Sequence, residues 1–169
     1  MLYALLNKHP QIALMYEADL FLLRPLFWAP RKGSKRLERW ELWNQAIKRH
    51  GLDESRVVPS MSHLSSAMRR AYQEYARRKG AVIWGEKSPN YYDSLGRLAR
   101  DFPDARFIII WREPAAICDS LFRAAQGTWF GRRGMTHRAL MGYKTLKTGC
   151  DRLLREGVSV HEVQYDALV

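Results

Sequence analysis

Five consecutive apolar residues in the second half of the chain place the strongest constraint on its fold. The run is Phe107–Trp111, with sequence FIIIW, and it is bounded by Arg106 and Arg112. It is too short for a buried helix, and its three β-branched isoleucines favour extended structure. A strand that is apolar without alternation is typical of a parallel sheet with helices on both faces. We therefore expect a strand at 107–111 that is covered on both faces.

The rest of the chain alternates between helical and extended patterns. Gly51, Gly80 and Gly157 are expected to end three of the helices, because glycine readily adopts the left-handed conformation of a helix C-terminus. Helices are expected at 2–8, 37–51, 61–79, 93–101, 114–125 and 137–155, and further strands at 81–84, 158–165 and within 11–21. This order predicts one α/β domain over residues 1–169, with a parallel sheet whose ligand lies at the carboxyl ends of the strands.

The charge of the chain points to an anionic partner. Its 169 residues include 28 Lys and Arg against 17 Asp and Glu, which gives a formal net charge of +11. The hydrophobic fraction of 47% is large enough to build a core, so a disordered basic tail is excluded. The surplus of positive charge favours a polyanion, a phosphorylated ligand or an acidic surface as partner.

Several other classes of protein are disfavoured by the composition. The two cysteines, Cys118 and Cys150, provide neither a disulfide framework nor the spacing of a zinc site, and we expect them to be buried thiols in a reducing cytoplasm. No metal site is suggested. No run of 18 apolar residues occurs, so no membrane span is expected. The apolar start of the chain lacks the basic leader and cleavage site of a signal peptide.

Arg112 and Ser120 are the first candidate binding residues. Arg112 directly follows the apolar strand, and Ser120 lies eight residues later, two turns into the next helix. A guanidinium can bind a phosphate through two parallel hydrogen bonds, and a hydroxyl adds a neutral donor. The alternative is that Arg112 pairs with Glu113 or a helix terminus, and that Ser120 has no function.

Lys87 and Glu17 are candidates for the chemistry. Lys87 lies in the segment Gly85–Pro89, which follows an apolar run, and its positive charge can stabilise an anionic transition state. Glu17, with Asp19 close by, can remove a proton from an attacking hydroxyl. The alternatives are a solvated turn for Lys87 and a surface carboxylate for Glu17.

Taken together, these segments resemble the sulfotransferases that use 3′-phosphoadenosine 5′-phosphosulfate (PAPS). The family pattern is GEK(S/T)P, then FP-A(R/K), then R(D/E)P and a serine, and the spacing and order of this sequence agree with it. The likeness extends over most of the chain and is least specific in residues 24–80. The matching segments are Val82–Tyr91, Phe102–Ile108, Arg112–Pro114 with Ser120, Leu5–Pro10 and Gln164–Val169.

The resemblance implies a fold, a reaction and roles for the candidate residues. The fold is a three-layer arrangement like that of P-loop NTPases, with a parallel sheet flanked by helices. Arg112 and Ser120 match the pair that binds the 3′-phosphate of PAPS, and Glu17 resembles the general base of the carbohydrate-type branch. Lys87 matches a lysine at the edge of the active site. The implied reaction is in-line transfer of a sulfuryl group to an acceptor hydroxyl or amine, without a metal.

One part of the family pattern is not found in this sequence. Sulfotransferases of this family begin with a strand and a loop of the type (K/R)SGTT, whose backbone N–H groups bind the 5′-phosphosulfate. Only Met1 precedes the matching helix, and no Gly-Thr-Thr or Walker-type sequence occurs elsewhere. We therefore expect a chain that lacks the first strand and the phosphosulfate loop and is truncated at both ends. Such a chain retains half of the PAPS site and can have the fold without the activity.

Two other functions stay open from the sequence. One is a non-catalytic domain that binds nucleic acid or another polyanion through the basic residues of 69–79 and Arg132-Arg133, with Trp129 and Phe130 as stacking faces. Scattered basic residues and the lack of a nucleic-acid-binding signature make nucleic acid the weaker choice. The other is a different phosphate-handling enzyme such as a kinase. The acceptor, a small molecule or saccharide, would contact residues 24–80 and 126–136, whose basic side chains suit an acidic saccharide.

Overall fold

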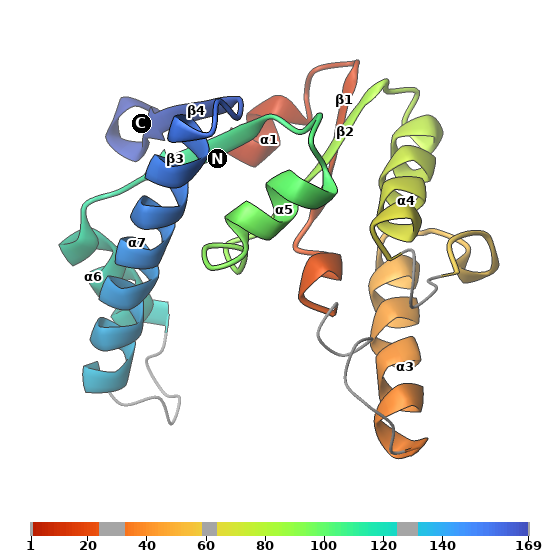
Figure 1. Ribbon diagram of the computed structural model, residues 1–169, viewed down its shortest axis with the longest axis horizontal. Helices are drawn as coiled ribbons and strands as arrows, with labels where there is room; N and C mark the ends of the chain where they lie inside the picture. Colours follow the sequence, from red (N-terminus) through yellow and green to blue (C-terminus); the bar gives the residue numbers. More distant parts are fainter. Residues whose placement is uncertain (1, 24–32, 59–63, 125–131, 169) are drawn as a thin grey trace. The chain divides into compact units, whose positions relative to one another are not determined.

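The computed structural model describes residues 2–23, 33–58, 64–124 and 132–168. These residues form two compact units, Met1–Tyr91 and Tyr92–Val169, and each unit contains a two-stranded parallel sheet (Figure 1). The chain is therefore an α/β protein with parallel strands, as its alternation of patterns predicted. A single domain over residues 1–169 stays a prediction.

The first unit is built on the pair β1 (Ile12–Tyr16) and β2 (Ile83–Lys87), which run parallel with Tyr16 opposite Lys87. Before them comes α1 (Leu2–Leu6). The 3₁₀ helix η1 (Leu20–Leu23), the helix α3 (Gly33–Arg49) and the 3₁₀ helix η2 (Glu54–Arg56) follow β1, and α4 (Leu64–Arg78) precedes β2. Because the strands are parallel, the carboxyl ends of β1 and β2 lie side by side.

Helix α4 packs on this sheet because its apolar residues recur at helical spacing. Its buried residues lie at positions i, i+3, i+4, i+7, i+8 and i+12, which form one stripe on an α-helix. They are Leu64, Ala67, Met68, Ala71, Tyr72 and Ala76. The stripe faces both β1 and β2. In α3, the indole of Trp43 is fully buried and donates a hydrogen bond from Nε1 to the Val57 carbonyl over 3.0 Å. These contacts fix α3 and α4 in the unit that contains the ends of β1 and β2.

The second unit is built on the parallel pair β3 (Phe107–Trp111) and β4 (Val160–Gln164). Its other elements are α5 (Leu95–Asp101), α6 (Pro114–Ala124), α7 (Arg132–Arg155) and the 3₁₀ helix η3 (Tyr165–Leu168). The core joins Ile109 and Trp111 of β3 to Leu95, Cys150 and Leu153 of the helices. Strand β3 thus ends with Trp111 in the core and Arg112 as the next residue.

Three expectations about these elements were wrong in detail. Within the second unit, strand β3 is covered on one face, since Ile109 and Trp111 are buried while Ile108 and Ile110 are 45% and 42% exposed. Strand β2 does not end at Trp84 but continues through Lys87, because that segment pairs residue by residue with β1. Helix α7 begins at Arg132, five residues before the start expected at 137. For β2, pairing with β1 extended the strand beyond its apolar residues.

Other expectations were confirmed. Gly51, Gly80 and Gly157 follow α3, α4 and α7 with φ of +71°, +68° and +73°, the left-handed conformation expected at a helix end. Cys118 and Cys150 are buried free thiols, and burial raises the pKa of Cys150. Within the described ranges, no helix combines the length and the apolar character needed to cross a membrane. The basic loop expected at 24–36 lies largely outside the described residues.

The unequal faces of β3 give a direct test of this unit. We expect Ile109→Val to lower the free energy of unfolding by about 1 kcal/mol, because it removes one buried methylene. The matched change Ile110→Val is expected to alter it by less than about 0.5 kcal/mol, because the side chain is exposed. Urea unfolding of both variants measures the difference, and equal losses would contradict the one-sided packing.

Candidate functional site

The turn that follows β1 has an unusual backbone. Glu17 and Asp19 have φ of 47° and 53°, and they are the non-glycine residues with positive φ in the described part of the chain. The left-handed conformation costs an L-residue of this kind roughly 1–2 kcal/mol. Such conformations persist only where the surroundings hold them, and they cluster at functional sites. The turn at 17–19 is therefore a place to look for chemistry.

Hydrogen bonds from neighbouring elements hold this turn. The Glu17 N–H donates to the Lys87 carbonyl over 2.8 Å, which continues the pairing of β1 with β2. The end of α3 contributes two further bonds: Arg49 Nη2 donates to the Glu17 carbonyl over 2.7 Å, and His50 Nε2 lies 3.0 Å from the Tyr16 carbonyl. The turn is thus tied to β2 on one side and to α3 on the other.

Glu17 and Lys87, predicted separately from the sequence, are in contact in the structure. Lys87 Nζ forms an ion pair with Glu17 Oε1 and lies 4.6 Å from the ring centroid of Tyr16. Both side chains remain about one-third exposed, at 35% for Lys87 and 34% for Glu17. A carboxylate and an ammonium are therefore held together at the carboxyl ends of two parallel strands, and both can be reached from solvent. Such a pair can accept a proton and stabilise a developing negative charge.

Asp19, the neighbouring carboxylate, is occupied by hydrogen bonds. Ser88 Oγ donates to Asp19 Oδ1 over 2.5 Å, and Asn90 Nδ2 donates to Asp19 Oδ2 over 2.8 Å. The Ser-Pro-Asn segment after β2 is thereby attached to the turn after β1. Asp19 fixes the geometry of this region, whereas Glu17 presents its carboxylate to Lys87.

Glu86 is the residue of this site that sequence reasoning missed. Its Oε1 accepts a hydrogen bond from the Asp19 N–H over 2.5 Å, and its Oε2 accepts from the hydroxyls of Tyr72 and, over 2.8 Å, Tyr91. Burial raises the pKa of Glu86 from 4.5 to about 7, although the hydroxyl hydrogen bonds act in the opposite direction. A titratable carboxyl thus directly precedes Lys87 in β2 and hydrogen-bonds the turn that contains Glu17.

The strand alternation contained a signal for Glu86. Trp84 and Glu86 are two residues apart in β2, so they point to the same face of the sheet. Both contact Tyr72 of α4: the Trp84 ring stacks on Tyr72 with centroids 5.8 Å apart, and Glu86 accepts its hydroxyl. Because the expected strand ended at Trp84, the prediction did not place Glu86 on the same face as Trp84. Burial and the Glu86 charge raise the pKa values of Tyr72 and Tyr91 in turn, so both remain hydrogen-bond donors at neutral pH.

In the second unit, Arg112 has an unpaired buried nitrogen. Among the described residues, its Nε is buried without a hydrogen-bond partner, and no ion pair joins the guanidinium to Glu113. The guanidinium carbon lies 4.6 Å from the ring centroid of Tyr165, the first residue of η3. A buried polar group without a partner is costly and calls for an explanation such as a missing ligand. The arrangement of Arg112 suits an anion.

Ser120 lies on α6, the helix that follows Arg112. It is exposed, and its hydroxyl has no hydrogen bond to another described residue. It is therefore available to a ligand, and its role stays a prediction. Across the described ranges, no group of three side chains is placed to bind a metal ion.

Comparison with known proteins gives one result. A family model described as "Sulfotransferase family" matches residues 1–169. No curated protein and no solved structure matches the chain significantly. The match covers both units, including all four predicted site residues, Glu17, Lys87, Arg112 and Ser120.

Proposed function

Because the chain belongs to the sulfotransferase family, we propose that it serves the transfer of a sulfuryl group from PAPS to an acceptor hydroxyl or amine. The Glu17–Lys87 pair at the ends of β1 and β2 carries this proposal. The acceptor is a small molecule or saccharide. PAPS supplies the sulfuryl group and leaves as adenosine 3′,5′-bisphosphate. We further propose the three-layer arrangement of the family, with helices on both sides of a parallel sheet.

Glu17 and Lys87 have complementary roles in this reaction. Glu17 takes the proton of the acceptor as the acceptor atom bonds to sulfur, which is general-base catalysis. Lys87 places its positive charge beside the oxygens on which negative charge develops as the old sulfur–oxygen bond breaks. Because the turn and β2 hold both groups, they need no rearrangement in the transition state.

Arg112 and Ser120 are proposed to bind the 3′-phosphate of the nucleotide. The unpaired Nε of Arg112 fits such a group, because a phosphate oxygen would satisfy it. The Tyr165 ring contacts the guanidinium group and helps to hold it in place. The exposed Ser120 hydroxyl on α6 supplies a second donor. These residues favour an anionic ligand without a metal ion.

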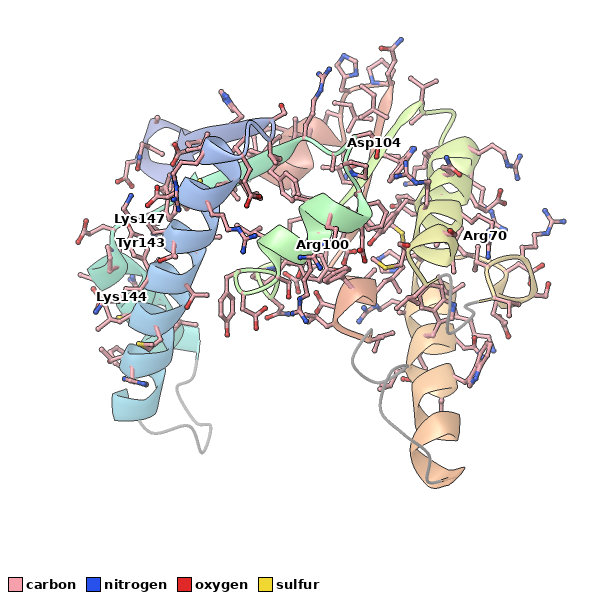
Figure 2. All side chains as sticks on the ribbon, in the orientation of Figure 1. Arg70, Arg100, Asp104, Tyr143, Lys144 and Lys147 are labelled. Carbon is pink, nitrogen blue, oxygen red and sulfur yellow. The ribbon has the colours of Figure 1, made fainter. Side chains whose placement is uncertain are left out.

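Binding of adenosine 3′,5′-bisphosphate to the full chain tests this assignment. We expect Arg112→Ala to weaken binding about 10–100-fold, because a hydrogen bond to a charged group contributes about 1.5–3 kcal/mol. Arg100→Ala is the matched control, since Arg100 is an exposed arginine on α5 of the same unit (Figure 2). Isothermal titration calorimetry measures both dissociation constants. Equal affinity of Arg112→Ala and wild type would overturn the 3′-phosphate assignment.

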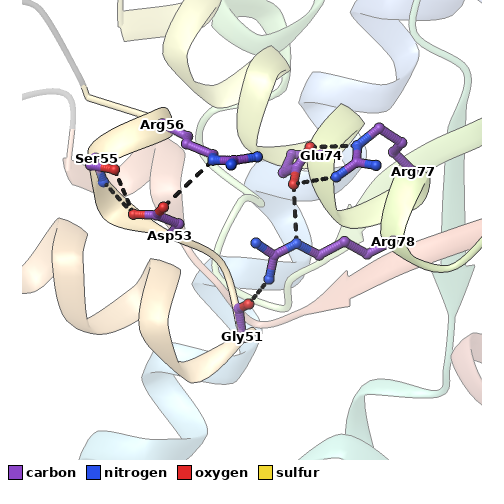
Figure 3. Close-up of polar contacts among 7 residues, drawn as sticks. All are labelled: Gly51, Asp53, Ser55, Arg56, Glu74, Arg77 and Arg78. Atoms are coloured by element: carbon purple, nitrogen blue, oxygen red, sulfur yellow. Dashed lines mark hydrogen bonds and ion pairs between the residues drawn. The ribbon is translucent and has the colours of Figure 1, made fainter.

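The alternative of a polyanion-binding surface is not favoured by the contacts of its residues. On α4, Glu74 accepts hydrogen bonds from both Arg77 and Arg78, and these bonds lower the pKa of Glu74 to about 2 (Figure 3). Arg78 also donates to the Gly51 carbonyl, and Arg70 donates to the Val58 carbonyl. Trp129 and Phe130, the expected stacking residues, lie outside the described residues. The arginines of α4 therefore have partners within the protein.

Basic side chains of the described residues also occur on several helices. Arg70 lies on α4, Arg100 on α5, and Lys144 and Lys147 on α7 (Figure 2). A polyanion site would show affinity for DNA with a steep dependence on salt concentration.

A further inference from the structure

Glu86 is a half-buried titratable group for which the proposed reaction has no direct use. Its carboxylate makes none of its described hydrogen bonds with the side chains of Glu17 or Lys87. Its contacts are instead the Asp19 N–H, from the turn after β1, and the hydroxyls of Tyr72 on α4 and Tyr91 beyond β2. Three donors from three different segments thus converge on its two oxygens.

We propose that Glu86 is a positioning residue, which holds the left-handed turn at 17–19 against β2 and so places the Glu17 carboxylate beside Lys87. The inference rests on the proposed role of Glu17 as the base.

The connection between Glu86 and the pair runs through the backbone. Glu86 binds the Asp19 N–H, and Asp19 is one of the two residues whose left-handed conformation forms the turn. Glu17, the other residue, hydrogen-bonds through its own N–H to Lys87, the neighbour of Glu86 in β2. Two adjacent residues of β2 therefore hold the two left-handed residues of the turn that follows β1. Loss of the Glu86 contact frees the turn to relax, and the Glu17 side chain moves away from Lys87.

Tyr72 and Tyr91 hold the Glu86 carboxylate in place through their hydroxyls. The Tyr91 oxygen both donates to Glu86 and accepts the Phe21 N–H over 3.2 Å, so that η1 is joined to the same group. Tyr72 is anchored on α4 by its stacking on Trp84. The nearby charged groups are the Asp19 carboxylate on the turn side and the Glu17–Lys87 pair beyond it. An ionised carboxylate accepts all three donors, while a glutamine in its place still offers one oxygen to Asp19.

Amide hydrogen exchange of the turn tests the structural part without any need for activity. We expect Glu86→Ala to raise the exchange rate of the Asp19 amide at least about tenfold, because the amide loses its acceptor. Glu86→Gln is expected to raise it less than about threefold. Glu41→Gln, at an exposed carboxylate of α3, and Tyr75→Phe, at another tyrosine of α4, are controls expected to leave it unchanged.

If Glu86→Ala does not fold, the double variant Tyr72→Phe with Tyr91→Phe replaces it. This variant removes both hydroxyl donors that fix the carboxylate, and we expect exchange at Asp19 to rise severalfold. Unchanged exchange in the folded variants would overturn the proposal.

Steady-state kinetics with PAPS and a saccharide acceptor tests the positioning of Glu17. We expect Glu86→Ala to lower kcat about tenfold or more with less than twofold change in the KM for PAPS, and Glu86→Gln to restore most of kcat. Faster exchange at Asp19 with an unchanged kcat would overturn the positioning role. Absence of transfer by the wild type would instead refute the proposed function, while hydrogen exchange would still report on the turn.

Discussion

In the wild type, titration of Glu86 is expected to lower the free energy of unfolding by about 2–3 kcal/mol between pH 4.5 and 8. Replacing Glu86 by glutamine is expected to abolish this change. Burial raises the pKa of Glu86 from 4.5 to about 7, so the folded protein binds this proton more tightly than the unfolded chain. The stabilisation from the proton is complete below pH 4.5 and is lost as pH rises through 7. Each pKa unit corresponds to about 1.36 kcal/mol, and the water contact of this half-buried side chain lowers the total somewhat.

Urea unfolding at several values between pH 4.5 and 8 measures this effect. The wild type should lose stability across the range relative to Glu86→Gln, which has no proton to release. Glu41→Gln removes an exposed carboxylate of the same unit and should follow the wild type. Parallel curves for wild type and Glu86→Gln would show that Glu86 titrates like an ordinary surface carboxylate.

Replacing Glu17 by glutamine is expected to lower kcat about 10²–10⁴-fold, the usual contribution of a general base. Glutamine has nearly the same shape and can still accept a hydrogen bond from Lys87, but it cannot take up the proton of the acceptor. Binding of adenosine 3′,5′-bisphosphate should stay within about twofold of the wild type, because its proposed ligands are Arg112 and Ser120. Transfer of labelled sulfuryl groups from PAPS to saccharide acceptors gives the rate.

The pair formed by Lys48 and Glu54 supplies a matched control for this experiment. It is also a lysine–glutamate pair of the first unit, with 2.8 Å between its charged atoms, but it lies on the surface formed by α3 and η2. Glu54→Gln should leave kcat unchanged, because an exposed ion pair contributes at most about 1 kcal/mol to stability. A wild-type rate in Glu17→Gln would assign proton removal to another residue.

Local chemistry made much of the fold predictable. Alternation of helical and extended patterns predicted parallel α/β structure, and β3 was placed at 107–111 because a short β-branched run has few other options. Helix ends at glycine were correct because left-handed backbone is intrinsic to that residue. The predictions were wrong where contacts between distant segments determine the secondary structure. Residues Gly85–Lys87 are extended because they pair with β1, although the segment contains charged residues and a glycine.

The candidate site was also predictable in part. The sequence by itself predicted which residues bear the chemistry, and it singled out Glu17, Lys87 and Arg112 because these charged residues follow apolar segments. Only the tertiary structure joined Glu17 to Lys87, since they are 70 residues apart and meet only through the parallel pairing of β1 with β2. It alone also revealed Glu86, because the carboxyl acquires its raised pKa from burial, which outweighs the opposite effect of the tyrosine hydroxyls that hydrogen-bond to it. Charge is a property of the residue, whereas proximity and burial belong to the packed chain.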